Sequence, residues 1–135
     1  MKKQQIQQIA LVMATALLLP VGTSAKAEAP HQPAKIVLTV EQIALQNPKQ
    51  YAKDQFAKYN WSDDQFACLS KLWGKESGWN HLADNPNSTA FGVAQMLGED
   101  SLLISVQIDR GLRYLEHRYG SPCVGWRFWQ QNKWY

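Results

Sequence analysis

The stretch SDDQFACLSKLWGKES, residues 62–77, carries the clearest helical pattern in the chain. Ser62 followed three residues later by Gln65 fits a capping box, and the two aspartates between them lie where the helix dipole favours acids. The apolar residues that follow recur at helical spacing and form one stripe: Phe66, Cys68, Leu69, Leu72 and Trp73. We therefore predict a helix that packs this stripe against the rest of a domain.

Glu76 lies at or just past the end of this predicted helix, where an acid is disfavoured. Gly74 weakens the last turn and Gly78 offers a stop. The C-terminal end of a helix is the negative end of its dipole, so a carboxyl group buried there has a raised pKa. Lys75 is expected to point to solvent, because neighbours on a helix diverge by about 100°. Glu76 is therefore the first candidate for acid–base chemistry.

Helix signals continue on both sides of this stretch. Thr39 with Gln42 fits a second capping box, and Asn47 before Pro48 fits an N-cap with proline at the first helical position. Residues 80–90 are typical of a loop. Residues 105–119 predict a helix ended by Gly120, and a last helix starts at Pro122. The fold class is thus mainly α: a small helical domain over residues 39–135, with a short β-hairpin within residues 80–91.

The first 27 residues have the layout of a secretory signal: two lysines, an apolar run over residues 9–19, and small residues up to Ala27. The run is shorter than the roughly 20 residues that a membrane-spanning helix needs. We expect cleavage near Ala27, a linker over residues 28–38, no stable membrane insertion afterwards, and a secreted, periplasmic or cell-wall location. An uncleaved membrane anchor is the alternative.

Charge gives no support for a nucleic-acid partner. The chain has 14 Lys+Arg and 11 Asp+Glu, but three of the lysines belong to the predicted signal, so the remaining chain has no net charge. Nucleic-acid binding favours a clustered basic surface. His31, His81 and His117 are isolated and match no zinc-ligand spacing, so neither a metal nor another cofactor is expected.

Cys68 and Cys123 are the only cysteines. In an exported protein an even cysteine count favours a disulfide, and two cysteines allow one intramolecular pairing. Two buried free thiols are the alternative.

All 15 aromatic residues lie between Tyr51 and Tyr135, and six of them are tryptophans. Aromatic rings pack cores, but they also line sites with one apolar and one wet side, as sugar-binding grooves have. We assign Trp73 to the core. Trp79, just after Glu76, is the better candidate for a groove wall.

Three segments in order resemble the lytic transglycosylases with a lysozyme-like fold, in particular their small secreted and phage-associated members. The segments are LWGKESGWN (72–80), NSTAFGVAQM (87–96) and GLRYLEHRYGSPCVGW (111–126). The resemblance runs from about Phe66 to the end of the chain. It implies a two-lobed helical fold with a groove for peptidoglycan glycan strands.

The resemblance also implies roles for individual residues. Glu76 matches the catalytic acid, and Ser77, Gln95 and Tyr114 would line the site near it. Trp126 is a further candidate substrate contact, with Trp79, although Gly125 and Trp126 stand where many members carry an Ala-Tyr pair. Small members carry cysteines that match Cys68 and Cys123, which favours the disulfide.

Three functions compete at this stage. A lytic transglycosylase works with one acid, so Glu76 would cleave the bond between N-acetylmuramic acid and N-acetylglucosamine and leave a 1,6-anhydro product. A muramidase of the same fold would hydrolyse this bond with water and usually needs a second carboxylate, for which Asp84, Glu99 and Asp100 are the nearest candidates in sequence. A non-catalytic wall-binding domain would keep the groove without needing Glu76.

Overall fold

The computed structural model describes residues 38–135, which belong to one compact unit. The predicted signal peptide and nearly all of the predicted linker lie outside the described residues. The described elements are α1 (Val40–Gln46), α2 (Pro48–Asp54), the 3₁₀ helix η1 (Phe56–Tyr59), α3 (Asp63–Glu76), β1 (Ala90–Phe91), β2 (Met96–Leu97), α4 (Ile104–Tyr119) and α5 (Pro122–Asn132). Within the described residues no helix is long and apolar enough to cross a membrane.

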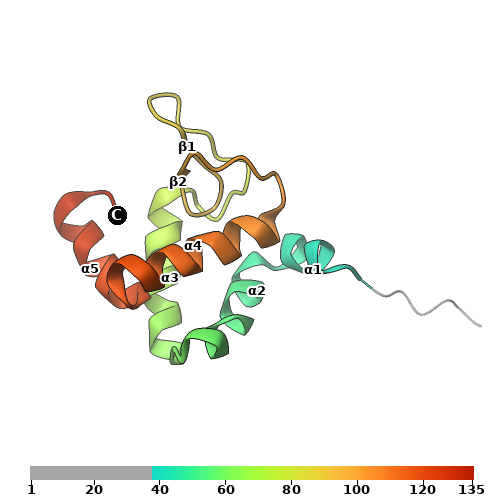
Figure 1. Cartoon of the computed structure of the whole chain (residues 1–135), viewed down its shortest axis with the longest axis horizontal. Helices are drawn as coiled ribbons and strands as arrows, with labels where there is room; N and C mark the ends of the chain where they lie inside the picture. The colour runs from blue at the N-terminus through green and yellow to red at the C-terminus, as the bar shows by residue number, and fades with distance from the viewer. Residues whose placement is uncertain (1–37) are drawn as a thin grey trace, which may run out of the picture. The chain divides into compact units, whose positions relative to one another are not determined.

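The fold class is confirmed: helices dominate, and β1 and β2 form one short antiparallel hairpin (Figure 1). The paired strands span residues 90–97, later than the predicted segment 80–91, within which one isolated antiparallel bridge joins Asp84 and Phe91. The reversal between the paired strands uses the left-handed residues Gly92 and Gln95. The preceding segment folds instead into turns closed by its own side chains, with Asn80 and Asn85 accepting backbone hydrogen bonds two residues on.

The centre of the fold is the crossing of α3 and α4 (Figure 1). Trp73 of α3 is fully buried, as predicted, and lies against Gly111 of α4. A Cβ atom at Gly111 would lie 2.6 Å from the Ala94 Cβ atom and 2.7 Å from the Trp73 ring, so only glycine allows this close approach. The two helices also contribute six aliphatic residues to the core: Leu69, Leu72, Ile104, Ile108, Leu112 and Leu115.

The start of α3 differs from the prediction in one respect. Ser62 is the N-cap residue, but its side chain makes no capping hydrogen bond. Gln65 accepts a hydrogen bond from the Cys123 backbone N–H at 2.9 Å, and so binds the start of α5 instead of closing a capping box. A tertiary contact has replaced the local one.

The predicted disulfide joins the same two helices. Cys68 of α3 and Cys123 of α5 are bonded, with their Cα atoms 4.9 Å apart. Gly125 brings α5 close to the core, because a Cβ atom there would lie 2.8 Å from Leu115 Cδ2. The bridge thus fixes α5, and the chain that follows it, on the side of α3.

Local signals correctly predicted three further helix ends. Thr39 and Gln42 form the capping box of α1, Asn47 caps α2 ahead of Pro48, and Gly120 ends α4 in the left-handed conformation. The start of α4 lacks a local cap, and Glu41 of α1 supplies one from a distance. Its carboxylate accepts hydrogen bonds from the backbone N–H groups of Ile104 and Ser105, at 2.8 and 3.1 Å.

This distant cap predicts a pH-dependent contribution to stability. Burial raises the pKa of Glu41, but the hydrogen bonds from Ser105 and Ile104 outweigh burial and hold the pKa below its ordinary value. The stabilisation is therefore present above the unfolded-state pKa, about 4.3, and is lost as the pH falls through the lowered folded-state pKa. Glu41→Gln should lower the free energy of unfolding by about 1 kcal/mol at neutral pH, as the loss of a helix cap does. At acidic pH, where Glu41 is protonated, the loss should be far smaller.

Urea unfolding of both proteins across the acid range measures this difference. Glu116→Gln, at an exposed position of α4, is the matched control and should change little at any pH. An equal loss in Glu41→Gln at neutral and acid pH would contradict the proposed cap.

Candidate functional site

The end of α3 is held by the side chain of Ser77. Glu76 is the last residue of α3 and Ser77 its C-cap. The Ser77 hydroxyl donates to the Val93 carbonyl at 2.6 Å and accepts from the Trp79 backbone N–H at 3.1 Å. Both contacts are internal, so Ser77 fixes the helix end against the hairpin turn and thereby positions Glu76.

Trp79 does not form an open groove wall, which corrects the prediction. Gly78 and Trp79 are both left-handed, and this turn folds the indole back onto α3. Trp79 is only 8% exposed, packs edge-to-face on Trp73 at 5.1 Å between ring centroids, and donates from its indole N–H to the Ser70 carbonyl. Trp79 therefore stabilises the end of α3 from the core and does not line the site.

The hairpin turn facing Glu76 is held by two glutamines. Gln95 donates from its side-chain amide to the Ala83 and Gly92 carbonyls, at 3.0 and 2.9 Å. Gln107 of α4 is buried and fully paired: it accepts from the Val93 N–H and donates to two carbonyls. A side chain at Gly92 would overlap that of Gln107. The spacing from Gly92 to Gln95 therefore has a structural explanation, since it builds a rigid turn.

Two adjoining pockets lie between this turn and the end of the chain. The acid pocket, about 270 Å³, is lined by Glu76, Asn85, Ser88, Ala90, Gln95, Leu97, Lys133, Trp134 and Tyr135. The arginine pocket, about 260 Å³, is lined by Ala94, Gln95, Met96, Leu97, Tyr114, Arg118, Trp134 and Tyr135. Because four residues line both, the two pockets form one continuous surface.

Only some of the predicted site residues line these pockets. Gln95 lines both pockets and Glu76 and Tyr114 line one each, whereas Ser77, Trp79 and Trp126 line neither. Trp126 instead stacks on Trp129, with ring centroids 5.3 Å apart and planes inclined by 12°.

The Glu76 carboxyl group is partly enclosed and incompletely paired. Its Oε1 atom is buried and has no hydrogen-bond partner among residues 38–135. Burial raises its pKa above the ordinary value, and the side chain of Trp129, which favours the ionised form, opposes this rise without cancelling it. A carboxyl group in this state retains its proton at higher pH than an exposed one and can donate it to a ligand in the pocket.

The other candidate carboxylates lie elsewhere. Glu99 and Asp100 both pair with Arg110, and Asp84 is exposed. Of the described residues that line the two pockets, Glu76 is the only one with an acidic side chain. Residues 38–135 also contain no group of three His, Cys, Asp or Glu side chains that could hold a metal ion.

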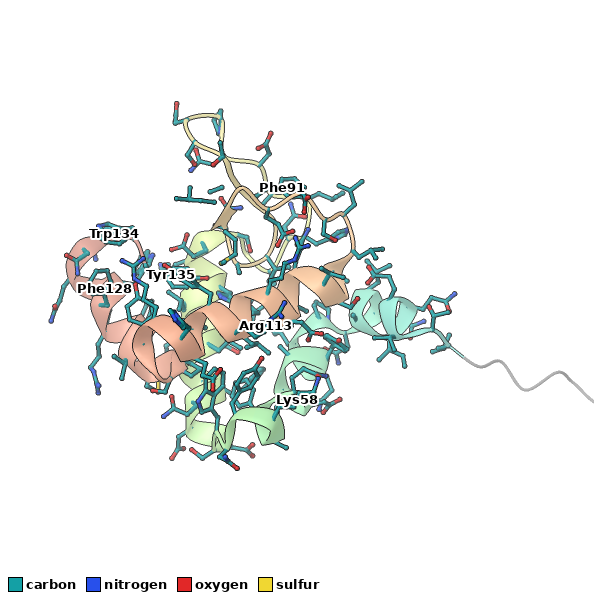
Figure 2. The ribbon with its side chains drawn as sticks, in the orientation of Figure 1. Lys58, Phe91, Arg113, Phe128, Trp134 and Tyr135 are labelled. Atoms are coloured by element: carbon teal, nitrogen blue, oxygen red, sulfur yellow. A yellow bond between two sulfur atoms is a disulfide. The ribbon has the colours of Figure 1, made fainter. Side chains whose placement is uncertain are left out.

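The segment from Trp129 to Tyr135 was missed as part of the site. Lys133 ends α5 in the left-handed conformation and turns the chain back towards α3. The Tyr135 hydroxyl then donates to the Ala94 carbonyl at 2.7 Å and accepts from the Trp73 indole N–H at 2.9 Å. Tyr135 lies between α5 and α3, while Trp134 lies beside α5 (Figure 2). The aromatic pair at the chain end was the only sequence signal for this closure.

Neither a family model, nor a curated protein, nor a solved structure matches the chain. We therefore infer the function from the site itself.

Burial of Glu76 predicts a gain in stability when its charge is removed. A carboxyl group whose folded-state pKa is raised destabilises the fold as the pH rises from the unfolded-state pKa, about 4.3, through the folded-state value. Glu76→Gln should therefore match the wild type in melting temperature at acid pH and exceed it at neutral pH. Calorimetry across this range measures the difference, with Glu116→Gln as control. A variant that melts lower at neutral pH would contradict the account.

Proposed function

We propose that this chain is an exported peptidoglycan lytic transglycosylase that cleaves the β-1,4 bond between N-acetylmuramic acid and N-acetylglucosamine. The observation that carries the proposal is the carboxyl group of Glu76, which has a raised pKa and a buried oxygen without a partner at the wall of a pocket. The resemblance of the three segments to that family, and the signal-like N-terminus, support the same conclusion.

Glu76 acts twice in the proposed reaction. Protonated, it donates its proton to the glycosidic oxygen as the bond to the anomeric carbon breaks, and the muramic N-acetyl group stabilises the resulting cation. The carboxylate then accepts the proton of the sugar's own 6-hydroxyl group, whose oxygen attacks the anomeric carbon. The product is a 1,6-anhydro sugar, and Glu76 is protonated again. One carboxyl group is sufficient, which suits pockets in which Glu76 has the only acidic side chain among the described residues.

The surroundings of Glu76 have matching roles. The indole of Trp134 and the ring of Tyr135 line the acid pocket with Glu76 and supply apolar surface beside the carboxyl group, which disfavours its ionised form. Trp134 is 52% exposed and lines both pockets, so its ring face is available to the apolar face of a sugar. Asn85, Ser88 and Gln95 add polar groups to the acid pocket, as a sugar site requires.

Incubation of residues 28–135 with purified cell-wall sacculi tests the proposal. We expect soluble muropeptides to be released. Binding to sacculi without release would favour the non-catalytic wall-binding domain. The absence of both binding and release would reject the glycan as the ligand.

A further inference from the structure

Arg118, on the last turn of α4, is held in place by aromatic rings. Its guanidinium carbon lies 5.1–5.9 Å from the ring centroids of four residues, and its Nη1 donates to the Tyr114 hydroxyl at 2.6 Å. The four rings are those of Tyr114, Tyr119, Phe128 and Trp134. Arginine stacked on aromatic faces within this distance is oriented electrostatically as well as by packing. The cation is therefore preorganised, although the residue is exposed.

This cation has no acidic partner in the part of the chain that the structure describes. The ion pairs there are Lys53 with Asp63, and Arg110 with Glu99 and Asp100. A guanidinium group has five N–H donors in a planar fork that matches a carboxylate. One hydrogen bond, to Tyr114, leaves most of this fork unused.

Arg118 lines the arginine pocket, directly beside the acid pocket that contains Glu76. Trp134 and Gln95 line both, so a ligand that reaches Glu76 can extend past Trp134 to Arg118. Arg118 has the only charged side chain among the described residues that line the arginine pocket, beside Tyr114, Tyr135, Gln95 and apolar side chains. One oriented cation in such surroundings favours a ligand with an anionic group at that point.

We propose that Arg118 binds a carboxylate of the peptide stem attached to the muramic sugar. This inference rests on the proposed function, since it takes the glycan as the ligand of the acid pocket. The sugars of the strand are neutral there, because the lactyl carboxyl group of muramic acid is consumed in the bond to the peptide. In glycan that bears peptide stems, the stem is the part that carries carboxylates, so Arg118 makes the surface favour stems with a free carboxylate over amidated ones.

Binding of a ligand that cannot be cleaved separates this inference from catalysis. The probes are N-acetylmuramoyl-L-alanyl-D-glutamate and its diamide, which lacks both charges, followed by tryptophan fluorescence or calorimetry. We expect the acid to bind about tenfold more tightly than the diamide, the size of effect typical of a charge-assisted hydrogen bond. The ratio should fall as salt is added.

Variants assign the ratio to Arg118. Arg118→Gln should reduce it to about one, and Arg118→Lys, which keeps the charge but loses the planar fork, should give an intermediate value. Arg127→Gln, at an exposed position of α5 outside both pockets, is the matched control and should keep the wild-type ratio. Because both affinities are measured on the same variant, a partial loss of folded protein affects them equally and leaves their ratio unchanged.

The outcomes are distinct. Equal affinity of the wild type for acid and diamide, or a ratio that persists in Arg118→Gln, would overturn the inference even if sacculi are cleaved. A ratio that depends on Arg118 would support it even in a protein that releases no fragments, in which case the proposed catalytic function would be the part that fails.

Discussion

Glu76→Gln should reduce the release of muropeptides from sacculi by about 10²–10⁴-fold, the range over which a positioned general acid contributes to catalysis. Glutamine has the shape of the protonated carboxyl group and can occupy the same place at the end of α3, but it has no proton to transfer. Because the variant is expected to be at least as stable as the wild type at neutral pH, its inactivity could not be attributed to unfolding.

Glu116→Gln is the matched control for this measurement, since it removes one exposed carboxylate from α4 without touching either pocket. It should leave release unchanged. Full activity in Glu76→Gln would reject Glu76 as the acid and, with it, the proposed mechanism. Undiminished binding to sacculi in both variants, with release in none of the proteins, would indicate a wall-binding domain.

Removal of the disulfide should have the largest effect on stability. The bond between Cys68 and Cys123 closes a loop with a sequence separation of 55. In the chain-entropy model a loop of that length contributes about 4 kcal/mol. For a domain of this size, the melting temperature of the Cys68→Ser, Cys123→Ser double variant should therefore fall by about 15–30 °C.

Reduction of the wild-type protein should reproduce this shift, and titration of the unreduced mature protein should find no free thiol. A decrease of only a few degrees would show that packing between α3 and α5 holds without the bond. Free thiols in the unreduced protein would contradict the bridge. Because α5 leads into the segment that lines both pockets, we also expect the double variant to lose activity below its melting temperature.

Local chemistry was sufficient to predict most helix ends. Three capping signals involve only residues that are close in sequence: Thr39 with Gln42, Asn47 with Pro48, and Gly120. Their effect could therefore be predicted without knowing the fold. The pair Ser62–Gln65 shows the limit: it has the pattern of a capping box, but Gln65 binds the Cys123 backbone instead. A pattern of local partners cannot reveal that a distant one is preferred.

The candidate site was predictable in part. Glu76 stood out because the position conflicts with the helix dipole, and the structure places it at the end of α3 beside a pocket. Trp79 could not be assigned from sequence, because its burial depends on two consecutive left-handed residues. The contributions of Trp134 and Tyr135 depend on the reversal at Lys133, which brings them against residues far away in the sequence.

The mass of the released fragments distinguishes transglycosylation by Glu76 alone from hydrolysis. Muropeptides released from sacculi by residues 28–135 should carry 1,6-anhydro-muramic ends, one water molecule lighter than the reducing ends that hydrolysis gives. Anhydro ends that disappear in Glu76→Gln are the result predicted here. Reducing ends would contradict the single-acid mechanism and make the protein a muramidase.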